Sequence, residues 1–564
     1  MTEKSEISDL KAKISQNKLL KNKLYLYLTE FFSGIAVMAV ELGASRLLAP
    51  YFSSSQIVWT IIIGTIMIAL ALGNIWGGRI ADRDPDPGRL YMRLVVAAVW
   101  IACIPLVGKY IIIGISGLLV LAVDTGYLVV AAFVSCMVIF AYPLFLLGTA
   151  TPSLVKFAME SMDDSGRTVG RLEAFNTVGS ILGTFLPTFV TIPAVGTSIT
   201  FLIFSSVLLI LGLIYFISTK TKLVASAVSV VIFVVCSIFG HSDSFAFWEK
   251  NLLYEGESIY NYLQVKETDR SILLSTNVLF GVQSVAMKDG GLTGMYYDTA
   301  LAAPLMSMDV TGTNPDELDI LVLGMGSGTY ATLCQKYYPG STVTGVEIDE
   351  KITDLAHEYF GLPETVESIT YDGRAYLEVD PNKYDVIMVD AYQDITIPFQ
   401  MSSVEFFTLV RDHLKPGGVM VVNLNMVSDG EGSINEWLCD TIASVFDDVV
   451  TVDVPGATNR ELFARNTADG NASLPNNGGS ISLLDFDGAP EGFGDIDFES
   501  RMLSVAEGLT PYSGGDNIFT DDRAPVELLG MGVIDELISE ELGYYKQVFN
   551  EKGLFGLISE LTGS

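Results

Sequence analysis

The sequence predicts a bundle of transmembrane helices followed by an α/β domain with a mostly parallel sheet. Long apolar runs fill residues 25–240, strand and helix patterns alternate through residues 306–470, and the charge balance changes between the two parts. Residues 1–250 contain 18 Lys and Arg against 15 Asp and Glu, whereas residues 251–564 contain 15 against 51. We therefore place the boundary between the two halves near residue 250.

The N-terminal half has the pattern of a multispan membrane region. Residues 1–24 are polar and Lys-rich, and we expect them in the cytoplasm. A helix needs about 20 apolar residues to cross a bilayer, and residues 25–245 hold seven or eight such runs. The count depends on PLVGK at 105–109, which divides residues 92–123 into two short runs. Eight crossings leave the second half in the cytoplasm, whereas seven leave it outside.

Two arguments about the side of the membrane disagree. The loop cations favour seven crossings, because Lys and Arg are enriched on the cytoplasmic side. Nucleoside cofactors are supplied in the cytoplasm, and for that reason we expect the second half there. The first run also carries Glu30, Glu41 and Arg46. Charges at this depth are costly, so they indicate either a Glu41–Arg46 pair or a transport or lipid-contacting role.

The second half divides into three parts. Residues 250–305 alternate like strands with turns such as Asp289-Gly290-Gly291, which predicts a small β-meander. Residues 306–470 alternate between strands and helices, which predicts a mostly parallel sheet covered by helices, with ELFARN at 461–466 as a last antiparallel strand. Residues 471–564 form a C-terminal extension, irregular to about residue 525 and helical after residue 531.

A glycine-rich turn predicts a Rossmann-like nucleoside site. In DILVLGMGSGTY, a strand runs into Gly324, Gly326 and Gly328, and the next strand, TVTGVE, ends at Glu347. Glycines let the backbone approach a ligand, and the following helix offers free N–H groups. An acid at the end of the second strand can accept the ribose hydroxyls. The pattern therefore indicates an adenosine-containing ligand.

Two further acids end strands at the same rim of the sheet. Asp372 follows SITY and could accept an adenine amino group, and Asp390 ends YDVIMVD. Ligands of such sheets bind outside the carboxyl ends of the strands, where these acids point. The glycines together with three strand-end acids are much more specific than the glycines alone.

Composition excludes some functions. The acidic second half would repel phosphates, so it is not a general nucleic-acid binder. Its charge suits a cationic substrate, or it is simply a solvated acidic surface. The chain has five Cys without a CxxC motif and only three His, which supports neither a metal site nor a disulfide framework.

With these motifs the chain resembles the spermidine synthase family of polyamine aminopropyltransferases, in particular its fused membrane-bound form with a multispan N-terminal region. The segments that carry the resemblance are ELGASRLLAPYF, ESIYNYLQV, DAYQDITIPFQMSSVEFF and VPGATNRELFA. It implies a class I methyltransferase/spermidine synthase-like fold and a membrane-anchored transferase of polyamine biosynthesis. Such an enzyme moves an aminopropyl group from decarboxylated S-adenosylmethionine to an amine.

The resemblance also assigns residues. Asp390 matches the acid that takes the proton of the acceptor amine. On the donor side, the resemblance implies Gly324, Gly326, Gly328, Glu347, Asp372 and Gln283. On the acceptor side it implies Tyr296, Tyr297, Asp298, Tyr392 and Gln393. This chain departs from the family at Gln393, Tyr297 and Asn261, all on the acceptor side, so the identity of the amine stays open.

Two other functions use the same sequence features. An S-adenosylmethionine-dependent methyltransferase shares the sheet and the glycine loop, although the β-meander and the Asp390 loop argue against it. A nucleoside or polyamine sensor, or a transporter, would need no chemistry, and the loss of the second loop acid at Gln393 favours it. In each case we expect membrane lipid and a small amine as partners, no nucleic acid and no metal, with a homodimer as one option for assembly.

Overall fold

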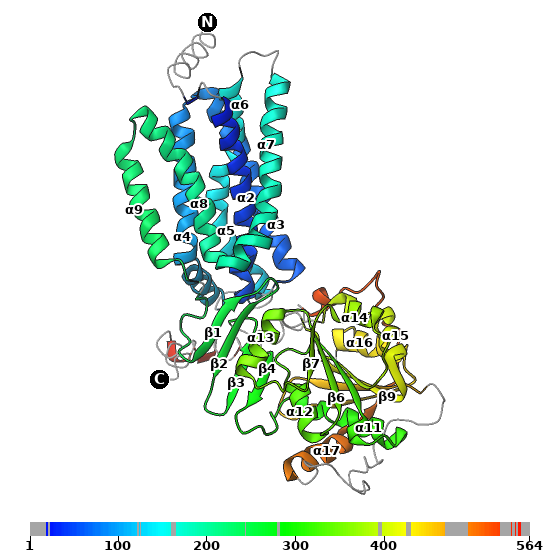
Figure 1. Ribbon diagram of the computed structural model, residues 1–564. Coiled ribbons are helices and arrows are strands. Elements are labelled where there is room, and N and C mark those ends of the chain that lie inside the picture. Colours follow the sequence, from blue (N-terminus) through cyan, green and yellow to red (C-terminus); the bar gives the residue numbers. More distant parts are fainter. Residues whose placement is uncertain are drawn as a thin grey trace.

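The structure is a computed structural model of the 564-residue chain. It describes residues 19–530 except 21–22, 53, 121–122, 124–125, 160–164, 243, 279–281, 393–396, 425–429 and 468–494, and beyond residue 530 only 543, 547–548 and 551–553. A helical bundle stands on one side of an α/β domain, with the β-meander between them (Figure 1). The bundle consists of α2 (Lys23–Phe52), α3 (Gln56–Arg83), α4 (Pro87–Val120), α5 (Tyr127–Gly148), α6 (Ala150–Ala158), α7 (Ser165–Leu186), η1 (Pro187–Thr191), α8 (Ile192–Thr219) and α9 (Leu223–Phe239).

Five helical segments of the described chain could cross a membrane, judged by length and composition. The expected seven to eight is therefore wrong by this measure. Helix α4 runs unbroken through Pro105, where the sequence suggested a break, and α9 has only 17 residues. The fifth segment, Ser165–Thr219, joins α7 and α8 and leaves helical geometry at Gly196, with φ 81° and ψ 171°. Both α7 and α8 pack against α2.

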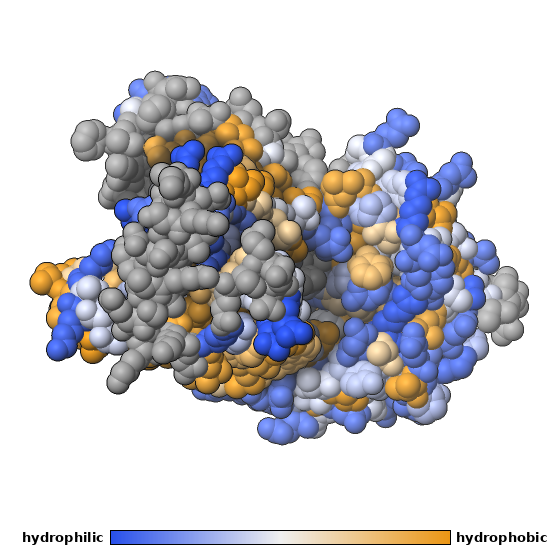
Figure 2. Space-filling model, turned by 90° about the horizontal axis from the view of Figure 1, so that it is seen from above, coloured by the Kyte–Doolittle hydropathy of each residue, from blue (hydrophilic) through white to orange (hydrophobic). Residues whose placement is uncertain are grey.

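Glycines let the bundle helices pack closely. A Cβ added at Gly179 would lie 2.1 Å from the carbonyl oxygen of Phe31, and one at Gly183 would lie 2.4 Å from that of Ile35. Helices α2 and α7 therefore meet backbone to backbone, as is common between helices in lipid. Large apolar side chains cover the outside of the bundle, among them Met67, Leu72, Phe189, Val224 and Phe239. Viewed from its free end, the bundle shows apolar flanks, while the α/β domain is mostly hydrophilic (Figure 2).

The start of α2 and the α/β domain lie at opposite ends of the bundle. At the free end the ring of Tyr91 stacks on those of Tyr25 and Tyr215, with centroids 5.4 and 4.4 Å apart. At the other end the Tyr51 hydroxyl donates to the carbonyl of Phe245 at 3.0 Å, just before the β-meander. This arrangement is visible in Figure 1.

The β-meander is antiparallel, in the order β1 (Leu252–Glu257), β2 (Tyr262–Glu267), β3 (Ser271–Ser275) and β4 (Ser284–Met287), as the sequence predicts. Its inner face packs Leu263, Val265 and Leu274 against Ile352 and Leu355 of α13 (Glu350–Tyr359). This contact fixes the meander beside the main sheet.

The main sheet has the order β12-β10-β11-β9-β8-β5-β6-β7. Strands β7, β6, β5, β8 and β9 are parallel, and β11 is antiparallel to both neighbours, as expected for ELFARN. The bounds are β5 (Asp319–Leu323), β6 (Thr342–Glu347), β7 (Glu367–Thr370), β8 (Tyr384–Val389), β9 (Leu414–Leu424), β10 (Asp448–Asp453), β11 (Arg460–Arg465) and β12 (Thr510–Pro511). The order reverses direction next to β5, and that point is where such sheets bind ligands.

Helices cover both faces of this sheet. One face packs against α10 (Tyr296–Ala300), α11 (Ala302–Thr311), α12 (Thr329–Tyr337) and α17 (Ile496–Gly508). The other packs against α14 (Gly373–Val379), α15 (Val404–His413) and α16 (Ile434–Ala443). Helix α17 and strand β12 lie in the tail that the sequence predicts to be irregular, and the helix predicted after residue 531 falls largely outside the described residues.

Candidate active site

The glycine turn joins β5 to α12 and lies against the end of β8. Gly324, Gly326 and Gly328 have φ of 80°, 56° and 79°, a region that side chains with a Cβ rarely adopt. At Gly324 a Cβ would also lie 2.5 Å from the Cα of Ala391. Only glycine therefore allows this turn to sit beside the residue that follows Asp390.

The Glu347 carboxylate lies at this turn, as the sequence predicts. Its Oε2 accepts a hydrogen bond from the backbone N–H of Gly326 at 2.9 Å, and its Oε1 accepts one from that of Asp349 at 3.0 Å. Glu347 is buried, and this desolvation raises its pKa above the usual value. The side chain thus ties the glycine turn to the end of β6.

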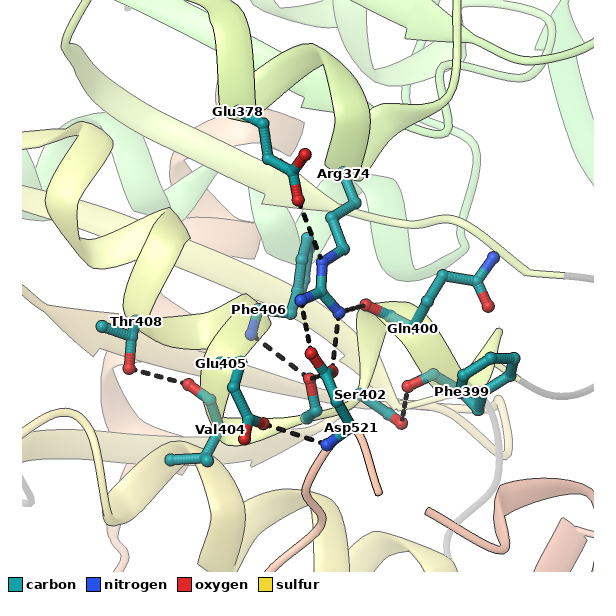
Figure 3. Close-up of polar contacts among 11 residues, drawn as sticks. Arg374, Glu378, Phe399, Gln400, Ser402, Val404, Glu405, Phe406, Thr408 and Asp521 are labelled. Carbon is teal, nitrogen blue, oxygen red and sulfur yellow. Dashed lines mark hydrogen bonds and ion pairs between the residues drawn. The ribbon is translucent and has the colours of Figure 1, made fainter. Parts of the chain in front are cut away.

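Asp372 lies one strand further out, after β7. Its Oδ1 caps α14 by accepting from the N–H of Ala375 at 2.8 Å. Two residues later, Arg374 donates to both carboxylate oxygens of Asp521, at 2.7 and 2.6 Å, and to the carbonyl of Gln400 at 2.9 Å (Figure 3). This clamp holds the segment around Asp521 against the helix that Asp372 begins.

Asp390 is the centre of a hydrogen-bonded cluster at the end of β8. Its Oδ2 accepts from the Tyr296 hydroxyl at 2.7 Å, and its Oδ1 accepts from the Asn423 amide at 3.0 Å. Asn459 in turn donates to Asn423 at 2.9 Å. Burial raises the pKa of Asp390 to about 7, although both hydrogen bonds oppose the rise. A carboxyl group with such a pKa can take up and release a proton near neutral pH.

Tyr297 and its neighbours in the sequence lie next to the Asp390 cluster. The Tyr297 ring lies 4.0 Å from that of Tyr296, and its hydroxyl donates to the carbonyl of Gln283 at 2.7 Å. Asp298 is fully buried, and its carboxylate accepts from the N–H and hydroxyl of Thr293 and from the N–H of Gly294. Those contacts shape the turn before α10, so a contact between Asp298 and an amine stays a prediction.

The loop after Asp390 is described only in part. The Tyr392 hydroxyl donates to the carbonyl of Asn423, next to the Asp390 cluster. Gln393 lies outside the described residues, so its predicted place on the acceptor side stays a prediction.

Sequence reasoning missed Asn423 and Asn459 of this cluster, and Glu461 beside it. Glu461 lies opposite Asn423 in the β9–β11 pairing and is fully buried. Within the described part of the chain, neither of its carboxylate oxygens has a hydrogen-bond partner. Burial raises its pKa well above the usual value, and Asp390 adds to the shift. The strand RELFAR has a charged residue at each end, so nothing in the sequence alone marks Glu461 as buried.

Comparison with known proteins agrees with this geometry. Residues 304–463 match the spermine/spermidine synthase domain. A relative from Bifidobacterium longum, a probable polyamine aminopropyl transferase, is 56% identical over 351 residues, covering 61% of this chain and 77% of the relative. A polyamine aminopropyltransferase from Vibrio vulnificus is 26% identical over 41% of this chain and 76% of its own length. A probable spermidine synthase from Corynebacterium glutamicum has a solved structure that is 26% identical, covering 38% of this chain and 79% of that one, with a TM-score of 0.34.

The sheet order and the glycine turn define a Rossmann-like α/β domain, a fold in which ligands bind at the switch point of the sheet. Its relatives are transferases. The chain belongs to the polyamine aminopropyltransferase family, as the resemblance of its motifs implied.

Proposed function

We propose that this chain transfers an aminopropyl group from decarboxylated S-adenosylmethionine to an amine, with Asp390 as the base. The observation that carries the proposal is the Asp390 carboxyl group, which has a pKa of about 7 and is aimed by Tyr296 and Asn423 at the rim beside the glycine turn. The fit of this chain to its family supports the same reaction.

The chemistry needs one proton acceptor. The amine nitrogen attacks the carbon next to the donor sulfonium, a C–N bond forms, the C–S bond breaks, and methylthioadenosine leaves as a neutral thioether. The nitrogen must shed a proton, and the Asp390 carboxylate is suited to accept it. Tyr296 and Asn423 each donate to one Asp390 oxygen, so they fix the direction in which its remaining lone pairs point.

Nucleoside recognition rests on the other strand-end groups. We assign the ribose to Glu347, the adenine edge to Asp372 and the close backbone approach to Gly324, Gly326 and Gly328. Glu347 and the glycine turn are already joined by the hydrogen bond from Gly326. Acids around the donor tail would attract the aminopropyl ammonium and repel the carboxylate of intact S-adenosylmethionine.

The acceptor side has a second acid available. Glu461 is buried beside the Asp390 cluster without a hydrogen-bond partner among the described residues, and a cationic amine would supply one. We infer that Glu461 complements the charge of the acceptor, together with Tyr296 and Tyr297. The acceptor is therefore a polyamine or related cationic amine.

Product analysis tests the proposed reaction. Purified full-length protein is incubated with each sulfonium donor and a panel of amines, and the products are identified by mass spectrometry. We expect methylthioadenosine and an amine heavier by one aminopropyl group. S-adenosylhomocysteine with a methylated product would instead identify a methyltransferase, and donor binding without any product would favour a sensor or transporter.

We further propose that the bundle anchors the enzyme in lipid with the catalytic domain on the outer side. Cations support this orientation, because they gather at the free end of the bundle, away from the domain. These are Lys23, Arg79, Arg83, Arg89, Arg93, Lys156, Arg167, Arg171, Lys220 and Lys222, and five more lysines precede α2 in the sequence. Among the described residues, the end of the bundle that faces the domain carries Arg46, Lys109 and Lys250. This orientation is opposite to the cytoplasmic placement expected from cofactor supply, which stays the alternative that cysteine labelling tests.

A further inference from the structure

Two of the motifs that carry the family resemblance, ELGASRLLAPYF at the end of α2 and ESIYNYLQV at the start of the β-meander, have no part in the proposed chemistry. They nevertheless contact each other in the structure. Arg46 of the first motif reaches from α2 to the loop between β1 and β2. Its Nη1 donates to the carbonyl of Ser258 at 3.2 Å, and its Nη2 donates to that of Ile259. The expected Glu41–Arg46 pair is replaced by this contact with the second half of the chain.

The loop that Arg46 holds is itself bound to the end of β6. The hydroxyl of Ser258 donates to Oδ2 of Asp349, and the side-chain amide of Asn261 donates to the same oxygen at 3.3 Å. Ser258 and Asp349 are 9% and 1% exposed, so solvent does not compete for these bonds. Asp349 also interacts electrostatically with Arg46.

Asp349 leads directly to the nucleoside site. Its backbone N–H donates to Oε1 of Glu347 at 3.0 Å, and Oε2 of Glu347 accepts from Gly326 of the glycine turn at 2.9 Å. A series of hydrogen bonds, joined through the covalent frames of Ser258 and Asp349, therefore connects Arg46 to Glu347 and Gly326. We propose that Arg46, a residue of the membrane bundle, is a positioning residue that sets the orientation of Glu347 for the donor.

A second contact between the halves avoids this set of bonds. Glu257 accepts from the backbone N–H and the hydroxyl of Thr197 on α8, each at 2.9 Å. It fastens β1 to the bundle and also interacts electrostatically with Arg46, but neither of its hydrogen bonds to Thr197 involves Ser258 or Asp349. The chain thus offers a matched control, because Thr197 helps to hold the domain in place without touching the path to the donor.

The experiment measures donor affinity in the full-length protein in detergent. Arg46→Met keeps the apolar stem of the side chain and removes both N–H groups that bind the carbonyls of Ser258 and Ile259. We expect the Kd of the aminopropyl donor to rise about tenfold, with the KM of the acceptor amine unchanged. Arg46→Lys retains the charge but replaces the planar guanidinium fork by a compact ammonium on a flexible stem, so an intermediate Kd is expected. Ser258→Ala should weaken donor binding to a similar extent. The double variant, Arg46→Met with Ser258→Ala, should bind the donor no more weakly than Ser258→Ala alone, because the two residues act in series. Thr197→Val should change the donor Kd by less than about twofold.

The outcomes separate this inference from the proposed function on which it rests. If Glu347→Gln leaves donor affinity unchanged, the ribose assignment is wrong whatever Arg46 does. If Glu347→Gln weakens donor binding but Arg46→Met does not, the positioning role of Arg46 is wrong and the proposed function stands. If Thr197→Val raises the donor Kd as much as Arg46→Met does, the bundle only anchors the domain. This result would also overturn the inference.

Discussion

At the residue scale, the chemistry concentrates on Asp390. Its carboxyl must be ionised to accept a proton, so turnover should rise with pH through about 7 and level off above it. Asp390→Asn should lower the single-turnover rate at saturating donor by roughly 10²–10⁴-fold and abolish that rise. Donor affinity should change little. A variant with a near-normal rate would remove Asp390 as the base.

The same shift predicts a gain in stability for this variant. A carboxyl whose pKa is raised in the folded state binds its proton more tightly there than in the unfolded chain. Ionising it therefore costs stability as the pH rises through about 7. Asp390→Asn should melt at a higher temperature than the parent protein at pH 8, with a smaller difference at pH 5. Equal melting temperatures at pH 8 would contradict the raised pKa.

Glu461 carries the prediction for the acceptor. Glu461→Gln keeps the shape but cannot ionise when the cationic amine binds, and a hydrogen bond to a charged group is worth about 1.5–3 kcal/mol. We expect the KM of the amine to rise by about tenfold to a hundredfold while donor affinity is unchanged. Asp412→Asn, at a carboxylate that is 64% exposed, controls for the loss of one acid. An unaltered amine KM in Glu461→Gln would show that the acid faces no substrate.

Some residues of this site can be predicted from the sequence alone, and others cannot. The glycines and strand-end acids follow from backbone geometry, because a turn with positive φ and a parallel sheet place them at one rim. Glu461 could not be found in this way, since an acid in a strand that also carries two Arg indicates nothing until the strand order is known. The β9–β11 pairing alone puts it opposite Asn423.

At the scale of elements, local patterns predicted the sheet well and the helices of the bundle less well. The segment PLVGK looked like a break because it combines Pro, Gly and Lys. In the structure, α4 continues through this segment, and the Lys109 ammonium reaches out of the helix to the carbonyl of Ser244 at the domain end. Gly108 lies within close reach of Leu47 on α2, where a Cβ would be 3.0 Å from Cδ2. Tertiary contacts that no sequence window contains therefore decide the helix length.

The α2–α7 contact can be tested with two glycines on one helix. At Gly179 a Cβ would lie 2.1 Å from the Phe31 carbonyl, so Gly179→Ala must force α2 and α7 apart. Overpacking of this kind costs about 1–3 kcal/mol, and the thermal midpoint in detergent should fall. Gly170 has no atom within 4 Å of such a Cβ, so Gly170→Ala should be neutral or stabilising. Equal effects of the two changes would mean that α2 and α7 do not pack this closely.

At the scale of the whole molecule, the bundle and the catalytic domain form one connected body. The Arg46 and Thr197 contacts join them directly, and the cations lie at the end away from the domain. Sequence alone could not fix the orientation, because the number of crossings was ambiguous and a single error reverses the side. In the structure the start of α2 and the domain lie at opposite ends of the bundle, so the side of the domain follows once the side of the α2 start is measured.

Orientation is tested with single cysteines and a membrane-impermeant maleimide on intact cells. The described native cysteines are buried or only partly exposed, so background labelling should be low. Val379, 72% exposed in the catalytic domain, is changed to Cys, as is the exposed Thr221 at the free end of the bundle. We expect Val379→Cys to be labelled in intact cells and Thr221→Cys only after permeabilisation, because the cations hold the free end in the cytoplasm. The reverse pattern would put the catalytic domain in the cytoplasm and show that cofactor supply, not loop charge, predicts its side.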